Sequence, residues 1–509
     1  MSLDFGRYSS LKIVEIGSRG VSLHDIALTV GTVLAISDFG LDKVQGQELF
    51  NAGVWPFAIS IIVFSLIIDR IGYKTAMFFA FLGHVIWAAM AMSAFFVKAS
   101  NPDLGFNLLY WGSLISALGN GVVEAFINPV VATMYKRDKT KWLNILHAGW
   151  PGGLVIGGLL TLALGSQAAD DWRILIYLIA GPAIIYVIML MGKEFPENER
   201  VSSGVSYKDM LAEFGVAGAL IASFLIFKQL GGVFGWEDAA VYFLISISIV
   251  FYGVYCQSLG RPLLIFLCVI MMPLATTELG TDGAITGIME EPMKAVKGGA
   301  LWVLIYTSAI MMVLRFFFAG PIVKKLTPIG LLVASAAFAV VGLFMLSSAT
   351  GMAAIFIFAT LYGLGKTFFW PTMLGVVSEQ CPKGGALTLN AIAGIGMLTV
   401  GIVGGPLIGK MQEDSAKLAI EKESDKGTYT KLSVDRTYFL GAYTAIDEEK
   451  LKALPKEEKE EVEKIAKRGK QSALANITVF PIMMLLAYIG LAYYFKRQGG
   501  YKAVELDSN

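Results

Sequence analysis

Long apolar stretches recur along nearly the whole chain, and this feature limits its possible folds more than any other. Each stretch approaches the ~20 residues that an α-helix needs to span about 30 Å of hydrocarbon. Of the 509 residues, 55% are hydrophobic and only 16% are charged, whereas charged residues make up about a quarter of a typical soluble domain. The sequence therefore predicts an all-α protein that crosses a lipid bilayer many times.

Fourteen membrane spans are predicted, arranged as six, two and six. They cover residues 22–41, 48–68, 76–97, 107–135, 142–165, 173–192, 214–234, 239–258, 262–288, 299–318, 329–348, 352–378, 386–410 and 474–496. The expected domains are a tail (1–21), a six-helix bundle (22–192), a linker with two extra helices (193–261), a second six-helix bundle (262–496) and a second tail (497–509).

Basic residues in alternate connections predict the orientation, because cytoplasmic loops carry an excess of Lys and Arg. Arg70 and Lys74 follow the second span, and four basic residues lie between 136 and 141 after the fourth. Both termini are therefore expected in the cytoplasm. The Lys- and Glu-rich segment 411–473 is expected to be an extracytoplasmic loop, its latter part a solvated helix, that serves as a cap or spacer.

A carboxyl group lies near the middle of the apolar stretch 108–134. Glu124 has Asn120 one helical turn before it and Asn128 one turn after it. A charge at the membrane centre costs roughly 2.5–3.5 kcal/mol on insertion scales, so we expect this polar stripe to face a water-filled cavity. Because burial favours the protonated form of a carboxyl group, Glu124 is a candidate proton carrier; the alternative is a structural ion pair with Lys366.

The two predicted six-helix regions contain similar segments. Gly121–Pro129 can be aligned with Gly363–Pro371, and a Leu-Asn pair follows each of them, ending at Asn144 and Asn390. Parallel repeats of this kind are a common transporter architecture. The alignment places Lys366 opposite the glutamate of the first segment, where it could hold that carboxyl ionised or contact an anionic substrate. The alternative is a lysine that reaches toward the membrane interface.

The segment Ser65–Lys74 resembles the signature of the major facilitator superfamily between its second and third spans. The resemblance implies two six-helix bundles related by a pseudo-twofold axis, here with two inserted helices. It also implies a cytoplasmic gate motif whose charged side chains pair and latch neighbouring helix ends. The gate motif would comprise Asp69, Arg70, Gly72 and Lys74.

Within the superfamily, the chain most resembles the fucose–proton symporter group. Glu124–Pro129 is similar to that group's fourth-helix pattern, and Leu143-Asn144 is similar to the Leu-Asn motif of its fifth helix. His147 stands where glutamine is expected, and Trp150 stands where an amide is expected. The resemblance implies a proton-coupled sugar transporter in which the glutamate carries the proton.

Further residues match this group in other spans. Trp370-Pro371-Thr372 resembles an aromatic-Pro-Thr motif of the tenth helix, Glu278 an acidic residue of the seventh, and Asp38 the aspartate of the first. Glu278 also lies four residues before Asp282. Because close carboxylates do not both ionise cheaply, this pair could hold a second proton or, with nearby threonines, a sodium ion. The alternative is that this end of the span lies in water.

The expected substrate-binding residues are amides, aromatic side chains and two charged groups. They are Asn120, Glu124, Asn128, Asn144, Trp150, Tyr362, Lys366, Trp370 and Asn390. Amides suit hydroxyl groups and aromatic rings suit the apolar face of a sugar, although interhelical bonding and core packing explain such residues equally well. The expected proton-coupling residues are Glu124, His147, Glu278, Asp282 and Asp38. His147 could relay protons or simply pack, and His84, Arg315 and Lys228 are interpreted as structural.

The most consistent function is alternating-access transport of a monosaccharide coupled to protons. A sugar-acid or nucleoside symporter, coupling to sodium, and a non-transporting solute sensor are the alternatives. No phosphate-binding Gly-x-x-x-x-Gly-Lys-Ser/Thr motif appears, and the three histidines are scattered, so neither an ATP-driven pump nor an enzyme is expected. A net charge of +1 suggests no nucleic-acid partner. We expect a monomer in the membrane, with no cofactor and no metal.

Overall fold

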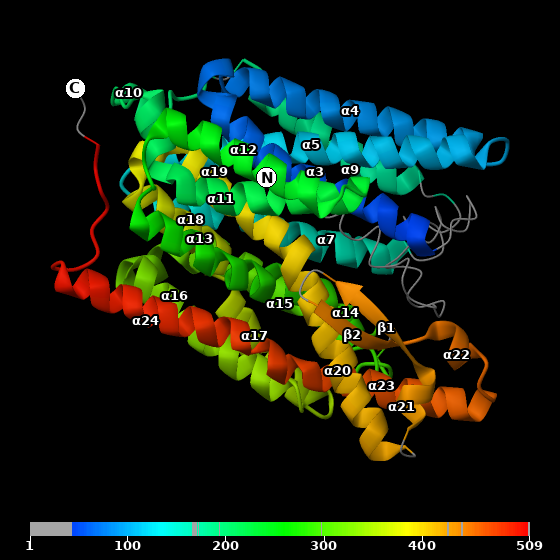
Figure 1. Cartoon of the computed structure of the whole chain (residues 1–509). Coiled ribbons are helices and arrows are strands. Elements are labelled where there is room, and N and C mark those ends of the chain that lie inside the picture. Colours follow the sequence, from blue (N-terminus) through cyan, green and yellow to red (C-terminus); the bar gives the residue numbers. More distant parts are fainter. Residues whose placement is uncertain are drawn as a thin grey trace.

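The computed structural model describes residues 43–164, 171, 173–192, 194–296, 298–424, 427–438 and 441–506, nearly all of them helical (Figure 1). The expected first span, 22–41, and its Asp38 lie outside the described residues. In Figure 1, α3–α5 lie on one side of the molecule and α16, α17 and α24 on the other.

The first group of helices includes one span that is broken into two pieces. Its members are α3 (Lys43–Ile71), α4 (Tyr73–Val97), α5 (Pro102–Met134), α6 (Lys139–Leu146), α7 (Gly149–Leu164) and α9 (Arg173–Leu190). The linker carries α10 (Glu199–Ser202), α11 (Tyr207–Phe234) and α12 (Asp238–Cys256). Between α3 and α4 the chain turns at Gly72, whose φ of +80° suits glycine.

The second group contains three short π-helical segments and one 3₁₀ turn. Its members are α13 (Pro262–Ala275), η1 (Thr276–Gly280), α14 (Thr281–Ile288), α15 (Leu301–Val313), η2 (Leu314–Phe318), α16 (Ala319–Leu346), α17 (Met352–Lys366), α18 (Phe369–Gln380), η3 (Pro382–Gly384), α19 (Gly385–Thr399), η4 (Val400–Gly404), α20 (Gly405–Glu423) and α24 (Val479–Arg497). Because π-helical turns leave backbone groups without regular partners, they often mark functional sites.

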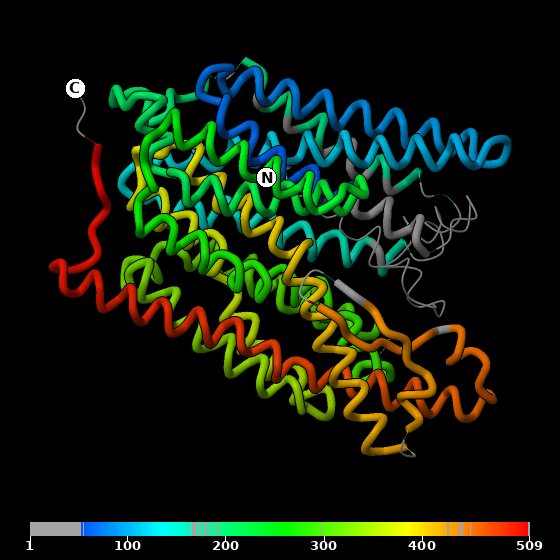
Figure 2. Tube along the Cα trace, in the orientation of Figure 1, coloured from blue at the N-terminus to red at the C-terminus, as the bar shows by residue number. Residues whose placement is uncertain are grey.

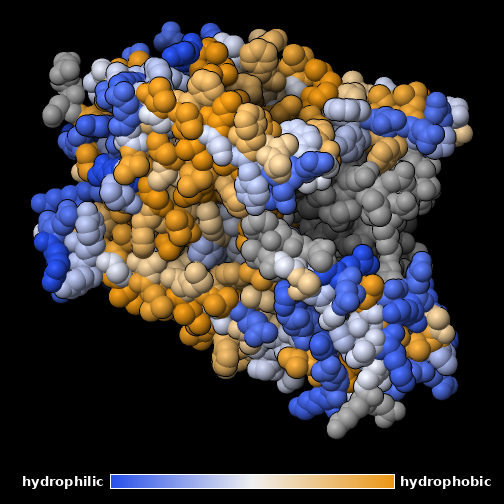
Figure 3. Space-filling model, in the orientation of Figure 1, coloured by the Kyte–Doolittle hydropathy of each residue, from blue (hydrophilic) through white to orange (hydrophobic). Residues whose placement is uncertain are grey.

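Ten helical stretches in the described part of the chain are long and apolar enough to cross a membrane. One of them, Leu301–Leu346, contains two of the expected spans, which separate at Thr327 where φ is +61°. The expected spans 48–68 and 173–192 coincide with α3 and α9. Figure 3 shows apolar surface along the sides of the bundle and hydrophilic surface at its ends, as a bilayer requires.

Small residues allow the helices to approach closely. A Cβ atom on Gly121 of α5 would lie 2.5 Å from the carbonyl oxygen of Phe57 in α3. In the second group, a Cβ atom on Gly342 of α16 would lie 2.3 Å from the backbone nitrogen of Tyr362 in α17. Both distances are too short for any side chain, so glycine is required where these helices cross.

Residues 411–473 form a folded appendage, whereas the sequence predicted mainly a charged loop. The helix α20 continues to Glu423, and α23 (Lys456–Ile477) returns beside it. Between them lie α21 (Thr428–Leu432), the strands β1 (Ser433–Tyr438) and β2 (Gly441–Ile446), which pair antiparallel, and α22 (Glu448–Lys452). A small apolar core explains the order; it consists of Ala416, Ile420, Tyr429, Leu432, Val462, Ile465 and Ala466.

Candidate functional site

A carboxyl group and an imidazole meet inside the first group of helices. Glu124 of α5 is 5% exposed, and His147, the residue that ends α6, is 6% exposed. Glu124 Oε1 lies 3.4 Å from His147 Nε2 and accepts a hydrogen bond of 3.2 Å from Asn128 Nδ2. Glu124 and Asn128 meet because they lie one turn apart on the same helix face.

The hydrogen bonds of His147 determine how many protons this pair needs. Nδ1 lies 2.9 Å from the carbonyl oxygen of Leu143, which can only accept, so Nδ1 carries a proton. If Nε2 and the carboxylate of Glu124 were both deprotonated, two lone pairs would face each other. The contact is a hydrogen bond only when one further proton lies on either Nε2 or Oε1.

Arg315, which the sequence suggested was only structural, joins the two groups of helices. Its guanidinium is 1% exposed; Nη1 donates to the carbonyl oxygen of His147 at 2.9 Å, and Nε donates to that of Thr367. His147 ends α6 and Thr367 ends α17, so Arg315 binds the negative ends of two interrupted helices. The sequence signal that could have marked Arg315 as a functional candidate is the presence of an arginine within an apolar run.

Glu278 and Asp282 each face a basic side chain of their own. Glu278 Oε1 accepts from Arg315 Nη2 at 2.8 Å, and its Oε2 accepts from the backbone nitrogen of Trp370 at 3.0 Å. Asp282 forms an ion pair with Lys366. The two carboxyl residues are 1% and 6% exposed, so the alternative that they lie in water is wrong.

Lys366 therefore does not form the ion pair with Glu124 that was considered as an alternative. It is fully buried and contacts Asp282 of α14. Its Nζ also lies 5.2 Å from the ring centroid of Tyr362, one turn earlier on α17. The alternative of a lysine reaching toward the membrane interface is likewise wrong, because the amine is enclosed within the second group of helices.

Among the described residues, this buried cluster holds one more carboxyl group than basic side chains. Glu124, Glu278 and Asp282 supply three carboxyl groups, whereas Arg315 and Lys366 supply two positive charges. An uncompensated charge in a buried environment costs several kcal/mol, so each of these carboxyl groups requires either a positive partner or a proton.

Two asparagines connect the two groups of helices. Asn144 Nδ2 of α6 donates to Thr372 Oγ1 of α18 at 3.1 Å, and Asn390 Nδ2 of α19 donates to the carbonyl oxygen of Ala125 in α5 at 2.7 Å. Both side chains are fully buried. The Leu-Asn motifs of the two repeats thus form matching bridges across the interface.

Three amide oxygens are buried without a hydrogen-bond partner among the described residues, namely Oδ1 of Asn128, Asn144 and Asn390. A buried acceptor that lacks a partner costs about 1–3 kcal/mol. Asn120 differs, because its Oδ1 lies 2.9 Å from Nε2 of His84 on α4. The amide oxygens of Asn128, Asn144 and Asn390 can accept bonds from a solute, whereas that of Asn120 is already used.

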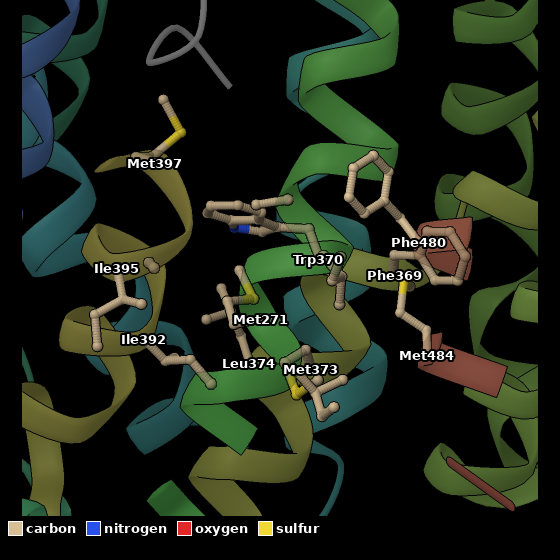
Figure 4. Close-up of a cluster of buried hydrophobic side chains, with 14 of the residues drawn as sticks. Met271, Phe369, Trp370, Met373, Leu374, Ile392, Ile395, Met397, Phe480 and Met484 are labelled. Carbon is tan, nitrogen blue, oxygen red and sulfur yellow. The ribbon is translucent and has the colours of Figure 1, made fainter. Parts of the chain in front are cut away.

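The predicted aromatic residues lie in the packed interior. The Tyr362 hydroxyl donates to the carbonyl oxygen of Thr277 at 2.9 Å. Trp150 packs with Leu154 and Met311. Figure 4 shows Trp370 among apolar side chains that include Met271, Ile395 and Met397. All three aromatic residues are thus surrounded by other side chains of the protein.

The gate motif is connected differently from the prediction. Asp69 Oδ2 accepts from Arg200 Nη2 at 2.8 Å and Nε at 3.1 Å. Arg70 instead lies over the ring of Tyr207, 4.2 Å from its centroid, and Lys74 is exposed. The expected pairing within the motif is wrong, because α10 of the linker supplies the partner.

The two groups of helices also meet at the end of the bundle where α10 lies. Lys139 Nζ is 2.6 Å from Glu199 Oε2 and donates to the carbonyl oxygen of Ser378 at 3.2 Å. Glu379 Oε1 accepts from the backbone nitrogen and hydroxyl of Thr140, at 3.0 and 2.6 Å. We call the region formed by residues 139–140, 198–200 and 378–381 the closed end.

Comparison with known proteins identifies the fold. Residues 21–406 match the family model described as Major Facilitator Superfamily. The chain belongs to the major facilitator superfamily. It is therefore a multi-pass integral membrane transporter with the two-bundle fold of that superfamily, and among the described residues α11 and α12 lie between the two groups of helices in the chain. No curated protein sequence matches the chain.

Solved superfamily structures align with almost the whole chain. The E. coli fucose:proton symporter FucP is 14% identical, with a TM-score of 0.52 over 94% of this chain and 98% of that one. The proton:xylose symporter XylE bound to 6-bromo-6-deoxy-D-glucose is 14% identical, with a TM-score of 0.56 over 99% and 98%. The nucleoside transporter NupG is 12% identical, with a TM-score of 0.51 over 96% and 99%. At these identities the similarity shows the fold alone.

Proposed function

We propose that this protein moves a monosaccharide across the membrane by alternating access, coupled to protons through Glu124 and His147. The contact between these two buried groups carries the proposal, since it is a hydrogen bond only with one proton in it. Loading or removing that proton changes the charge of a cluster that spans both bundles. Such a change can alter the relative stability of the two access states.

The balance of charges favours protons over sodium as the coupling ion. Glu278 and Asp282 were the candidate sodium ligands, but Arg315 and Lys366 already neutralise them. A sodium ion there would have to displace a buried basic side chain. The pair formed by Glu124 and the imidazole is the part of the cluster that can change its charge without such a displacement.

A neutral polyhydroxylated solute fits the buried amides best. Three Oδ1 atoms, of Asn128, Asn144 and Asn390, can accept hydrogen bonds from hydroxyl groups. A sugar acid is less well supported, because Lys366, the residue proposed to attract it, is bonded to Asp282. Fucose and xylose symporters are among the similar structures, which is consistent with a sugar substrate. At 14% identity, however, their similarity is evidence for the fold alone.

We further propose that the closed end faces the cytoplasm. The basic residues between 136 and 141 and the gate motif at Asp69 both lie at this end. The positive-inside rule then places both termini in the cytoplasm and the appendage outside.

Uptake into proteoliposomes tests the proposal. Labelled L-fucose, D-xylose, D-galactose and D-glucose would be offered with and without an inward proton gradient, to wild type, Glu124→Gln and the control Asp238→Asn. Asp238 suits as a control because its side chain is 78% exposed on α12. We expect accumulation by wild type and the control, and exchange without accumulation by Glu124→Gln.

Three results would contradict the proposal. Gradient-driven accumulation by Glu124→Gln would remove this residue from proton coupling. Uptake of nucleosides or sugar acids, with none of any sugar, would replace the proposed substrate. Binding of a sugar without transport under any gradient would favour a solute sensor.

A further inference from the structure

The residues after α24 fold back across the closed end. Gly499 and Gly500 have φ values of +88° and +104°, which allow the chain to reverse direction after the helix. Gln380 Nε2 then donates to the carbonyl oxygen of Lys502 at 2.7 Å. Figures 1 and 2 show this tail running from α24 toward α10 along one end of the bundle.

The tail binds Glu379, the residue that joins the two bundles at this end. The hydroxyl of Tyr501 donates to Glu379 Oε2 at 2.7 Å, and the backbone nitrogen of Val504 donates to the Glu379 carbonyl oxygen at 2.8 Å. The other carboxylate oxygen, Oε1, accepts both bonds from Thr140 of the first bundle. Glu379 is therefore held by the tail on one side and by α6 on the other.

The chemistry of Tyr501 suits a stable contact. Burial raises the pKa of its hydroxyl well above the usual value, so the group remains a donor. Its ring packs edge-on against Phe495, with 5.0 Å between centroids. A hydrogen bond to a charged acceptor is stronger than one between neutral groups.

We propose that residues 501–504 are an intramolecular strap that stabilises the closed end. Tyr501 and Val504 act as positioning residues, which hold Glu379 in the orientation that reaches Thr140. Opening of this end requires the bonds to Thr140 to break, and release of the strap favours that step. The inference rests on the alternating access proposed above, but not on the identity of the solute or the coupling ion.

A native cysteine can report whether the closed end opens. Cys381, two residues after Glu379, is 1% exposed and lines a small cavity between the bundles together with Pro129 and Thr133. Burial raises its pKa to about 12, so it should react slowly with maleimides while this end is closed. The other two cysteines, Cys256 and Cys268, are buried and can be replaced by serine to leave one reactive site.

The experiment compares maleimide labelling rates of Cys381 in membrane vesicles that expose the closed end. The variants are Tyr501→Phe, a chain ending at residue 500, and Glu379→Gln, with Tyr494→Phe as control because that tyrosine lies exposed on α24. We expect labelling about tenfold faster for the first three and unchanged for the control. Tyr501→Phe should add little in a Glu379→Gln background, because the substitution of Glu379 has already removed the charged acceptor of the Tyr501 hydroxyl.

The possible outcomes separate this inference from the transport proposal. Faster labelling in Glu379→Gln alone, with Tyr501→Phe and the shortened chain unchanged, would overturn the strap. Such a result would still leave Glu379 as a residue that stabilises the closed end. Additive effects of Glu379→Gln and Tyr501→Phe would also overturn it. Sugar uptake is not measured in this experiment. A wrong substrate assignment would therefore not change the interpretation of the labelling rates.

Discussion

Arg315 and His147 are joined by a hydrogen bond of 2.9 Å from Nη1 to the backbone carbonyl oxygen, and this bond connects the two bundles. His147 is also the residue whose ring faces Glu124. The same guanidinium binds Glu278 in the second bundle. In the proton coupling proposed above, a change of protonation at Glu124 and His147 would reach the second bundle through a single residue, Arg315.

Replacing His147 should uncouple transport from protons. We expect His147→Gln to keep sugar exchange but lose most proton-driven accumulation, because an amide side chain does not take up or release a proton as an imidazole does. His84→Gln is the matched control, since His84 is buried but bonded to Asn120. Proton-driven accumulation by His147→Gln at the wild-type level would remove the imidazole from coupling.

Removing the charge of Arg315 should destabilise the protein more than removing its whole ion pair. Arg315→Met leaves Glu278 buried and ionised without its base, which costs about 3–5 kcal/mol. Adding Glu278→Gln removes that charge and should recover a large part of the loss. Thermal unfolding in detergent measures both variants. If the double variant were no more stable than Arg315→Met, the two residues would not act as a pair.

Substitution of Asn128 should weaken sugar binding, whereas substitution of Asn120 should not. Asn128→Ala removes a buried acceptor that lacks a partner, and we expect the KM for the transported sugar to rise at least fivefold. Asn120→Ala removes an amide that is bonded to His84 and should leave KM within about twofold. Equal effects of the two substitutions would contradict the inference that the solute bonds to Asn128 rather than to Asn120.

Breaking the bond between Asp69 and Arg200 should open the closed end. Asp69→Asn leaves the buried guanidinium of Arg200 without its carboxylate, so we expect both a lower unfolding temperature and faster maleimide labelling of Cys381. Lys74→Ala should change neither, because Lys74 is exposed. Equal effects of the two substitutions would favour the pairing within the gate motif that the sequence predicted.

The membrane fold could be predicted from the sequence because hydrocarbon thickness imposes a length on each apolar run. Among the described residues, each expected span from 48–68 onward lies on one helix or on two or three consecutive helical segments. The resemblance to the major facilitator superfamily, based on segments such as Ser65–Lys74 and Glu124–Pro129, is confirmed by the family match over residues 21–406. The appendage was not predicted as a folded unit, because its apolar residues are few and only the pairing of α20 with α23 brings them together.

The partners of the charged residues could not be predicted in the same way. Pseudo-twofold symmetry placed Lys366 opposite Glu124, yet the lysine bonds Asp282. Sequence proximity suggested partners for Asp69 within its own motif, yet the linker supplies Arg200. In both cases the residue types were informative, but the pairing depended on which helices pack together.

The sequence by itself determined that this protein is a bundle of membrane-spanning helices of a recognisable family, with a carboxyl group at Glu124 inside an apolar stretch. These properties follow from the length and composition of local segments, which the bilayer selects directly. Only the tertiary structure decided that Glu124 meets His147, that Arg315 joins the bundles and that the tail reaches Glu379. Hydrogen bonds form over about 3 Å, and distances of that size between distant helices are set by packing of the whole chain.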